Sequence, residues 1–227
     1  MTITLEDLDW VVFDADETLF DFNIYEGLKT LFNSYDVSFT EKDFAQYQQL
    51  NGQLWLDYEA NKITMEQIKL GRFAHWSERL NVEPLTLNHG FLDAMATTSK
   101  PLSGAIALLS SLQDKVKVAI MTNGMAKLQY KRLRNTGVEQ FIDALFISEE
   151  VGAAKPSKEI YLYAMAKMGH PQPQRVLMVG DNPSTDILGA NSVNWRSCLY
   201  DPANKYPQHQ ADFKVNHLNQ LQQILVK

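Results

Sequence analysis

The sequence predicts an α/β protein: a Rossmann-like parallel sheet core into which a helical cap is inserted. Two observations predict this fold. First, five short apolar runs that resemble buried strands alternate with segments of helical periodicity, as in parallel sheets covered by helices on both faces. Second, a long stretch after the first of these runs carries helical periodicity only. A chain of 227 residues is long enough for such a core and an insertion.

The first strand is expected at Leu8–Phe13, because the run LDWVVF is β-branched in its middle and stops before Asp14. Four later runs have the same character: Val116–Met121, Ala144–Ile147, Val176–Val179 and Ser197–Tyr200. Helices are expected between them, at Gly104–Leu112, Met125–Asn135, Lys158–Met168 and Ser184–Ala190. A surface loop at 201–210, a short strand and an amphipathic helix at Leu218–Leu225 should complete the chain.

The helical cap is expected at residues 20–97, which leaves residues 1–19 and 98–227 for the core. Thr40 and Thr64 each stand where a helix start is expected, and Thr64 is followed by a capping-box glutamine. The cap stretch is rich in aromatic residues. At helical spacing, most of these rings should pack cap helices against one another.

Composition excludes several classes of protein. The 21 Lys and Arg residues against 27 Asp and Glu give a formal net charge of −6, which disfavours a partner such as a nucleic acid polymer. The single cysteine, Cys198, rules out an intramolecular disulfide and suits a reducing compartment. No apolar run approaches the roughly 20 residues that span a bilayer, and the first residues lack signal-peptide features. We therefore expect a cytoplasmic protein that has no membrane partner.

Polar residues that could bind a ligand or take part in a reaction lie in four short segments, each near the carboxyl end of an expected strand. In an open parallel sheet, that edge is where ligands bind. The segments are Asp14-Ala15-Asp16-Glu17-Thr18, Thr122-Asn123-Gly124, Lys155-Pro156 and the run GDNPSTD at 180–186.

The first segment indicates a metal site. Asp14 and Asp16 are two residues apart after a buried strand, and Coulomb repulsion between carboxylates ~4 Å apart is about 4 kcal/mol at an effective dielectric near 20. A divalent cation would offset that repulsion, and Asp181 can supply a third oxygen. Oxygen ligands completed by water suit Mg²⁺. The sequence holds no His or Cys cluster that would favour a softer metal.

The second and third segments indicate an anion site. The Thr122 hydroxyl and the backbone N–H groups of Asn123 and Gly124 come at an expected helix start, a favourable place for an anion. Lys155 adds a positive charge. A carboxylate nucleophile, Mg²⁺, a hydroxyl and a lysine at one place describe a site for phosphoryl transfer.

These segments resemble the four motifs of the haloacid dehalogenase superfamily, in the family's order: DADETLF, IMTNG, AAKPSKEIY and VGDNPSTD. The resemblance implies that Asp14 is the nucleophile and forms an aspartyl-phosphate. It implies that Asp16 is the general acid and base and also offers Mg²⁺ its backbone carbonyl. The remaining implied roles are phosphoryl binding by Thr122 and Lys155, Mg²⁺ ligation by Asp181, and support of the metal site by Asp186.

The acid at position 16 narrows the range of reactions that the family resemblance allows. Dehalogenases of the superfamily need no acid at this position, so an acid there implies a phosphatase or a phosphomutase. Mutases of this type usually have Gly where Thr18 stands, which favours the phosphatase. The cap stretches LWLDYEANKIT and GRFAHWSERLNVEP resemble the bacterial house-cleaning pyrimidine 5′-nucleotidases, which include the dUMP phosphatase. That likeness implies hydrolysis of pyrimidine nucleoside monophosphates such as dUMP and dTMP.

Three aromatic residues near the expected seam of cap and core are candidates to stack on a base: Phe20, Trp55 and Tyr58. A helical cap suits a small phosphomonoester as substrate, and we expect a monomer or a weak homo-oligomer. The alternatives are a phosphatase of a sugar phosphate or phosphoglycolate, a phosphomutase, and a non-catalytic binding protein that kept the fold.

Overall fold

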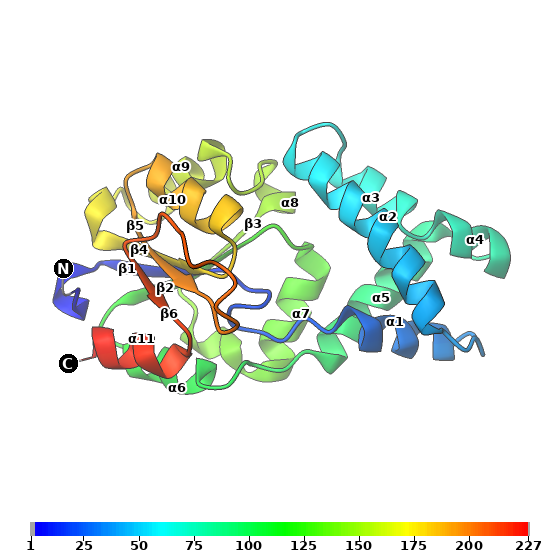
Figure 1. Ribbon diagram of the computed structural model, residues 1–227, viewed down its shortest axis with the longest axis horizontal. Coiled ribbons are helices and arrows are strands. Elements are labelled where there is room, and N and C mark those ends of the chain that lie inside the picture. Colours follow the sequence, from blue (N-terminus) through cyan, green and yellow to red (C-terminus); the bar gives the residue numbers. More distant parts are fainter. Residues whose placement is uncertain (1–2, 227) are drawn as a thin grey trace. The chain divides into compact units, whose positions relative to one another are not determined.

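The computed structural model of the protein describes residues 3–226. Within them the chain forms a six-stranded sheet in the order β3-β2-β1-β4-β5-β6, and every neighbouring pair is parallel (Figure 1). The strands are β1 (Trp10–Phe13), β2 (Lys117–Thr122), β3 (Ala144–Ile147), β4 (Val176–Gly180), β5 (Arg196–Tyr200) and β6 (Phe213–Val215). The predicted Rossmann-like α/β class is therefore confirmed.

The strand order places β1 at the point where the chain changes direction across the sheet. From β1 the sheet extends on one side through β2 and β3, and on the other through β4, β5 and β6. Phe13, the last residue of β1, is paired with Ile120 of β2 and with Val179 of β4. The carboxyl ends of these three strands therefore lie at one edge, at the switch point where ligands bind in open α/β sheets.

Helices cover both faces of the sheet (Figure 1). One face packs under α9 (Lys158–Lys167) and α10 (Leu188–Ser192), in a core that includes Met121, Met178 and Trp195. Fully burying one such apolar side chain contributes roughly 1.5–3 kcal/mol. The other face is covered by α6 (Ala105–Leu112) and α11 (Leu218–Leu225). The remaining helical segments of this part of the chain are short: η1 (Leu5–Asp7), η2 (Val138–Phe141), α8 (Ser148–Val151), η3 (Pro173–Arg175) and η4 (Pro183–Ile187).

The chain divides into two compact units. The described parts of Met1–Asp21, Lys100–Ala126 and Thr136–Lys227 make up the first unit, which contains the sheet. The second unit consists of Phe22–Ser99 and Lys127–Asn135. Its helices are α1 (Ile24–Asn33), α2 (Glu41–Glu59), α3 (Met65–Gly71), α4 (Ala74–Leu80), α5 (Pro84–Thr98) and nearly all of α7 (Ala126–Thr136).

The second unit is helical and has an aromatic interior. Phe32 stacks on Phe39 with their ring centroids 4.8 Å apart, and its centroid lies 4.2 Å from that of Trp76. All three rings are buried. The capping boxes at Thr40 and Thr64 are both present and start α2 and α3. The helix starts at Thr40 and Thr64 and the packing of aromatic rings within this unit are therefore as the sequence predicts.

Helix α7 belongs mostly to the second unit, although it directly follows a strand of the first. Lys127 and Lys131, one helical turn apart, both contact the carboxylate of Asp93 on α5, at 2.9 and 2.8 Å. Asn135 donates a hydrogen bond to the carbonyl of Ala96, also on α5. These contacts join α7 side by side to α5.

Across residues 3–226, the structure has no helix with both the length and the apolar character that crossing a bilayer requires.

Replacing Asp93 with Asn tests the α5–α7 contact. Partial burial raises the pKa of Asp93, but hydrogen bonds from Lys131 and Lys127 outweigh this effect and hold the pKa below its usual value. A lowered carboxyl pKa stabilises the fold above the unfolded-state pKa, and this contribution is lost as the pH falls through the folded-state pKa.

Because all three side chains are partly exposed, we expect Asp93→Asn to lose only on the order of 0.5 kcal/mol at neutral pH. Urea unfolding at neutral pH and in strong acid would measure the difference, which should vanish in acid. A loss that persists in acid would contradict the ionic origin of the contact.

Candidate active site

The first site residue, Asp14, directly follows β1 and is 7% exposed. Its backbone N–H donates to the carbonyl of Val179 on β4 at 2.8 Å, which fixes the chain at the point where the strand ends. The chain then turns sharply, and Glu17 adopts a positive φ of 59°. The turn leaves Asp16 half-buried, next to the sheet edge.

Two further carboxylates come from the segment after β4. Asp181 follows the strand, and η4, a single π-helical turn, brings Asp186 back toward it. The Asn182 side chain caps this turn by accepting a hydrogen bond from the Ser184 backbone at 2.9 Å. Carboxylate oxygens of Asp14, Asp181 and Asp186 all lie within 4.8 Å of one another. Single π-helical turns are frequent at functional sites because they change the direction of side chains.

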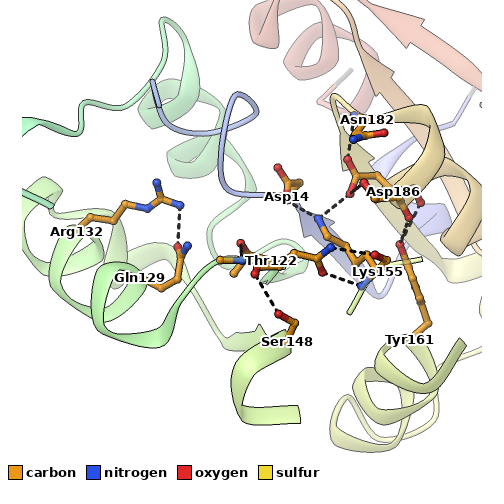
Figure 2. A network of polar contacts seen from close by, with 12 residues as sticks. Asp14, Thr122, Gln129, Arg132, Ser148, Lys155, Tyr161, Asn182 and Asp186 are labelled. Atoms are coloured by element: carbon orange, nitrogen blue, oxygen red, sulfur yellow. Dashed lines mark hydrogen bonds and ion pairs between the residues drawn. The ribbon is translucent and has the colours of Figure 1, made fainter. Parts of the chain in front are cut away.

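Lys155 lies among these acids. Its ammonium contacts the carboxylates of Asp14 and Asp186, the latter at 2.6 Å, and all three side chains are buried (Figure 2). Burial alone would lower the pKa of the Lys155 ammonium, but Asp14 and Asp186 outweigh it and raise that pKa. Lys155 is therefore a fixed positive charge in the site.

A reciprocal pair of hydrogen bonds holds the backbone of Lys155. The Asn123 amide donates to the Lys155 carbonyl at 2.9 Å and accepts from the Lys155 backbone N–H at 2.7 Å. The buried Ser148 hydroxyl in turn donates to the Asn123 carbonyl at 3.1 Å (Figure 2). The side chain of Asn123 thus fixes the loop that carries Lys155.

Thr122 is the last residue of β2 and is almost fully buried. Its hydroxyl accepts a hydrogen bond from the Gly124 backbone at 2.9 Å, which closes the loop before α7. The first N–H of α7, that of Ala126, donates to the carboxylate of Glu149 at 2.7 Å. Of the donors that the sequence suggested for an anion, the Gly124 N–H is therefore already paired with the Thr122 hydroxyl.

The charges of the site fit a divalent cation. When all three carboxylates are ionised, they and the one ammonium carry a net charge of −2. Burial, followed by repulsion from Asp186, raises the pKa of Asp181 to about 7. Burial also raises the pKa of Asp14, and neighbouring carboxylates add to this effect against the attraction of Lys155. A bound Mg²⁺ would supply the missing positive charge and favour the ionised forms.

The structure brings together four of the residues that the sequence singled out. Asp14, Lys155, Asp181 and Asp186 share one place, whereas the Asp16 side chain is not part of the group of three carboxylates. This arrangement is compatible with the expected backbone contribution of Asp16.

The three aromatic candidates are in different situations. The ring of Phe20 is fully buried, and its backbone forms bridges to Asp16 and Pro101. Trp55 and Tyr58 both lie on α2, partly buried, with ring centroids 5.8 Å apart in an edge-to-face arrangement.

Comparison with known proteins identifies relatives over nearly the whole chain. The model of the haloacid dehalogenase-like hydrolase family matches residues 8–194. Pyrimidine 5′-nucleotidase YjjG of Escherichia coli K12 is 46% identical over 221 residues, which are 96% of this chain and 98% of that one. Pyrimidine 5′-nucleotidase PynA of Streptococcus pneumoniae R6 is 28% identical and covers 96% of this chain and 95% of its own.

Among solved structures, the crystal structure of the HAD-hydrolase YfnB from Bacillus subtilis has a TM-score of 0.82 at 28% identity. It covers 96% of this chain and 98% of its own, is bound to magnesium, and is described as revealing interdomain movement. Such coverage means that the likeness extends over both units of the chain.

Gly180, at the end of β4, tests how tightly the acids are packed. An ideal Cβ there would lie 2.2 Å from Oδ2 of Asp186, so alanine would displace that carboxylate. We expect Gly180→Ala to cost about 1–3 kcal/mol of stability and to weaken binding of Mg²⁺. Urea unfolding and titration calorimetry would measure the two effects.

The matched control is Gly52→Ala in α2, where an added methyl group meets nothing within 4 Å. It should stabilise the protein by up to ~1 kcal/mol through helix propensity and leave Mg²⁺ binding unchanged. Equal Mg²⁺ affinities for the two variants would argue against close packing at Gly180.

Proposed function

Because the chain belongs to the haloacid dehalogenase-like hydrolase family, we propose that it is a phosphatase that hydrolyses pyrimidine 5′-nucleoside monophosphates such as dUMP and dTMP. The observation that carries this proposal is the 46% identity to a pyrimidine 5′-nucleotidase across 96% of the chain. An alignment of that extent includes residues 22–99, the helical unit, and not only the motifs common to the family. Substrate choice in such a protein depends on the parts that differ between family members.

The first step forms a covalent intermediate. An oxygen of the Asp14 carboxylate attacks the phosphorus atom, and the bond between phosphorus and the ester oxygen breaks. The leaving oxygen takes the proton of Asp16, so the products are the nucleoside and an aspartyl-phosphate. The Lys155 ammonium, held next to Asp14, neutralises charge on the phosphoryl oxygens, and the Thr122 hydroxyl binds one of them.

The second step releases phosphate. Asp16, now a carboxylate, accepts a proton from a water molecule as that water attacks the phosphorus atom. The bond between phosphorus and Asp14 breaks, which regenerates the Asp14 carboxylate and yields inorganic phosphate. The first step needs Asp14 ionised, which the neighbouring Lys155 favours, and the second step returns Asp14 to that form.

The proposed cofactor is Mg²⁺, held by the side chains of Asp14 and Asp181 and the backbone carbonyl of Asp16. When bound, it supplies a Lewis acid that neutralises charge on the phosphate and lowers its repulsion from the nucleophile. Asp186 contacts Lys155 and supports the other ligands. Two observations support this assignment: the net charge of the site, and the magnesium bound to the related YfnB.

The proposed substrate is a small molecule. We keep Trp55 and Tyr58 as candidates to stack on the base and give Phe20 less weight, because its ring is fully buried. We also propose a cytoplasmic enzyme that acts as a monomer or weak homo-oligomer. The second candidate function, hydrolysis of a sugar phosphate or phosphoglycolate, needs the same core residues and differs only in the alcohol that leaves the phosphoryl group.

A panel of phosphomonoesters tests the substrate. With Mg²⁺ present, we expect kcat/KM for dUMP and dTMP to exceed that for ribose 5-phosphate and phosphoglycolate by at least tenfold. Release of inorganic phosphate measures all four on one scale. EDTA should abolish the activity and added Mg²⁺ should restore it. A preference for ribose 5-phosphate or phosphoglycolate would refute the nucleotidase and keep the phosphatase.

Substitution of the two motif acids tests the chemistry. Asp14→Asn should reduce turnover of dUMP to background, because the amide is a poor nucleophile. Asp16→Asn should lower kcat by about 10²- to 10⁴-fold, since no proton can be given or taken. Asp36→Asn, an exposed change in the second unit, serves as the control. Near-normal turnover by a folded Asp14→Asn protein would disprove the assigned nucleophile.

A further inference from the structure

Tyr161 on α9 is a fully buried tyrosine that no step of the proposed reaction uses. Its hydroxyl lies 2.9 Å from the carbonyl oxygen of Thr185 and 3.2 Å from that of Asp186, and donates to both (Figure 2). Both carbonyls belong to η4, the π-helical turn that carries Asp186. One side chain from a different helix thus holds two successive peptide groups of this turn.

The ring of Tyr161 is closely packed between Trp195 and Gly189. It packs edge-on against Trp195, with their centroids 5.2 Å apart. At Gly189 on α10, an ideal Cβ would lie 2.3 Å from the tyrosine ring, so only glycine leaves room for it. This packing on both sides fixes the position of the hydroxyl next to η4.

A continuous set of contacts connects this hydroxyl to the nucleophile. The Asp186 peptide that Tyr161 holds carries the carboxylate whose Oδ2 accepts from the Asn182 backbone at 3.0 Å. Oδ1 of the same carboxylate accepts from the Lys155 ammonium at 2.6 Å, and that ammonium also contacts Asp14. A rotation of the Asp186 peptide would move its carboxylate and, with it, the ammonium.

We propose that Tyr161 is a positioning residue for this centre: its hydroxyl fixes the peptide groups of η4 and thereby orients Asp186, Lys155 and the acids that hold Mg²⁺. The inference rests on the proposed function, since it concerns the same centre. Tyr161 acts through Asp186. Groups that orient the ligands of a metal affect its affinity strongly, and their loss commonly costs 10- to 100-fold.

The test compares Tyr161→Phe with Tyr163→Phe. The first removes only the buried hydroxyl and keeps the ring. The second removes a hydroxyl two residues further along the same helix, from a side chain that is 42% exposed. Calorimetry measures the Mg²⁺ affinity of each protein, and p-nitrophenyl phosphate hydrolysis gives kcat and KM. Urea unfolding shows the stability of both.

We expect Tyr161→Phe to bind Mg²⁺ about tenfold more weakly and to lose about tenfold in kcat with little change in KM. Tyr163→Phe should match the wild type in all three measurements. A Tyr161→Phe protein that has lower stability but unchanged Mg²⁺ affinity and kcat would overturn the proposal, because Tyr161 would then only pack the core. Failure of this variant to fold would overturn it as well, because the hydroxyl would be a structural requirement.

Gly189→Ala provides an independent variant, since it keeps the hydroxyl and displaces the ring. It should also weaken Mg²⁺ binding, and unchanged affinity would contradict the claim that the position of the Tyr161 ring matters for the site. The calorimetric comparison does not depend on which ester the enzyme hydrolyses. If the wild type ignored dUMP, the proposed substrate would fail while the comparison of Tyr161 and Tyr163 variants would still decide this proposal.

Discussion

The candidate active site is organised around one buried ammonium group, that of Lys155. Lys155 lies between the carboxylates of Asp14 and Asp186, away from water, and each carboxylate would be costly to bury without it. Removing one partner from a buried ion pair typically costs about 3–5 kcal/mol, because the other charge is then left without compensation. The two hydrogen bonds between the Asn123 amide and the Lys155 backbone, one in each direction, therefore matter to the site because they hold the loop that carries this charge.

Much of the architecture was predictable because it depends on local patterns. Apolar runs of strand length identify the sheet, and residues directly after parallel strands must share one edge, which is why Asp14 and Asp181 could be placed together. Threonine caps likewise predicted the starts of α2 and α3. In each case the signal lies within a few residues of the feature.

The unpredicted features depend on contacts between distant segments. The amide of Asn123 binds a backbone 32 residues away, and Ser148 and Tyr161 donate to carbonyl groups, an interaction that leaves no pattern in a sequence. The segment expected as a regular helix at Ser184–Ala190 begins instead as a π-helical turn. Its neighbours explain the difference, because Asp186 must reach Lys155 while Gly180 leaves space for the carboxylate.

The division of the chain at helix α7 affects how segments could be exchanged between related proteins. The α7 segment Lys127–Asn135 belongs to the same compact unit as Phe22–Ser99, although Lys100–Ala126, which belongs to the first unit, lies between these two segments in the sequence, so the helical unit is not one contiguous segment. Several of its side chains are buried, among them Arg132, which donates to Gln129 at 2.7 Å. Residues 22–99 transferred alone to another protein would lack the α7 segment that contacts α5. Recombination between relatives should therefore preserve both segments as a co-inherited pair.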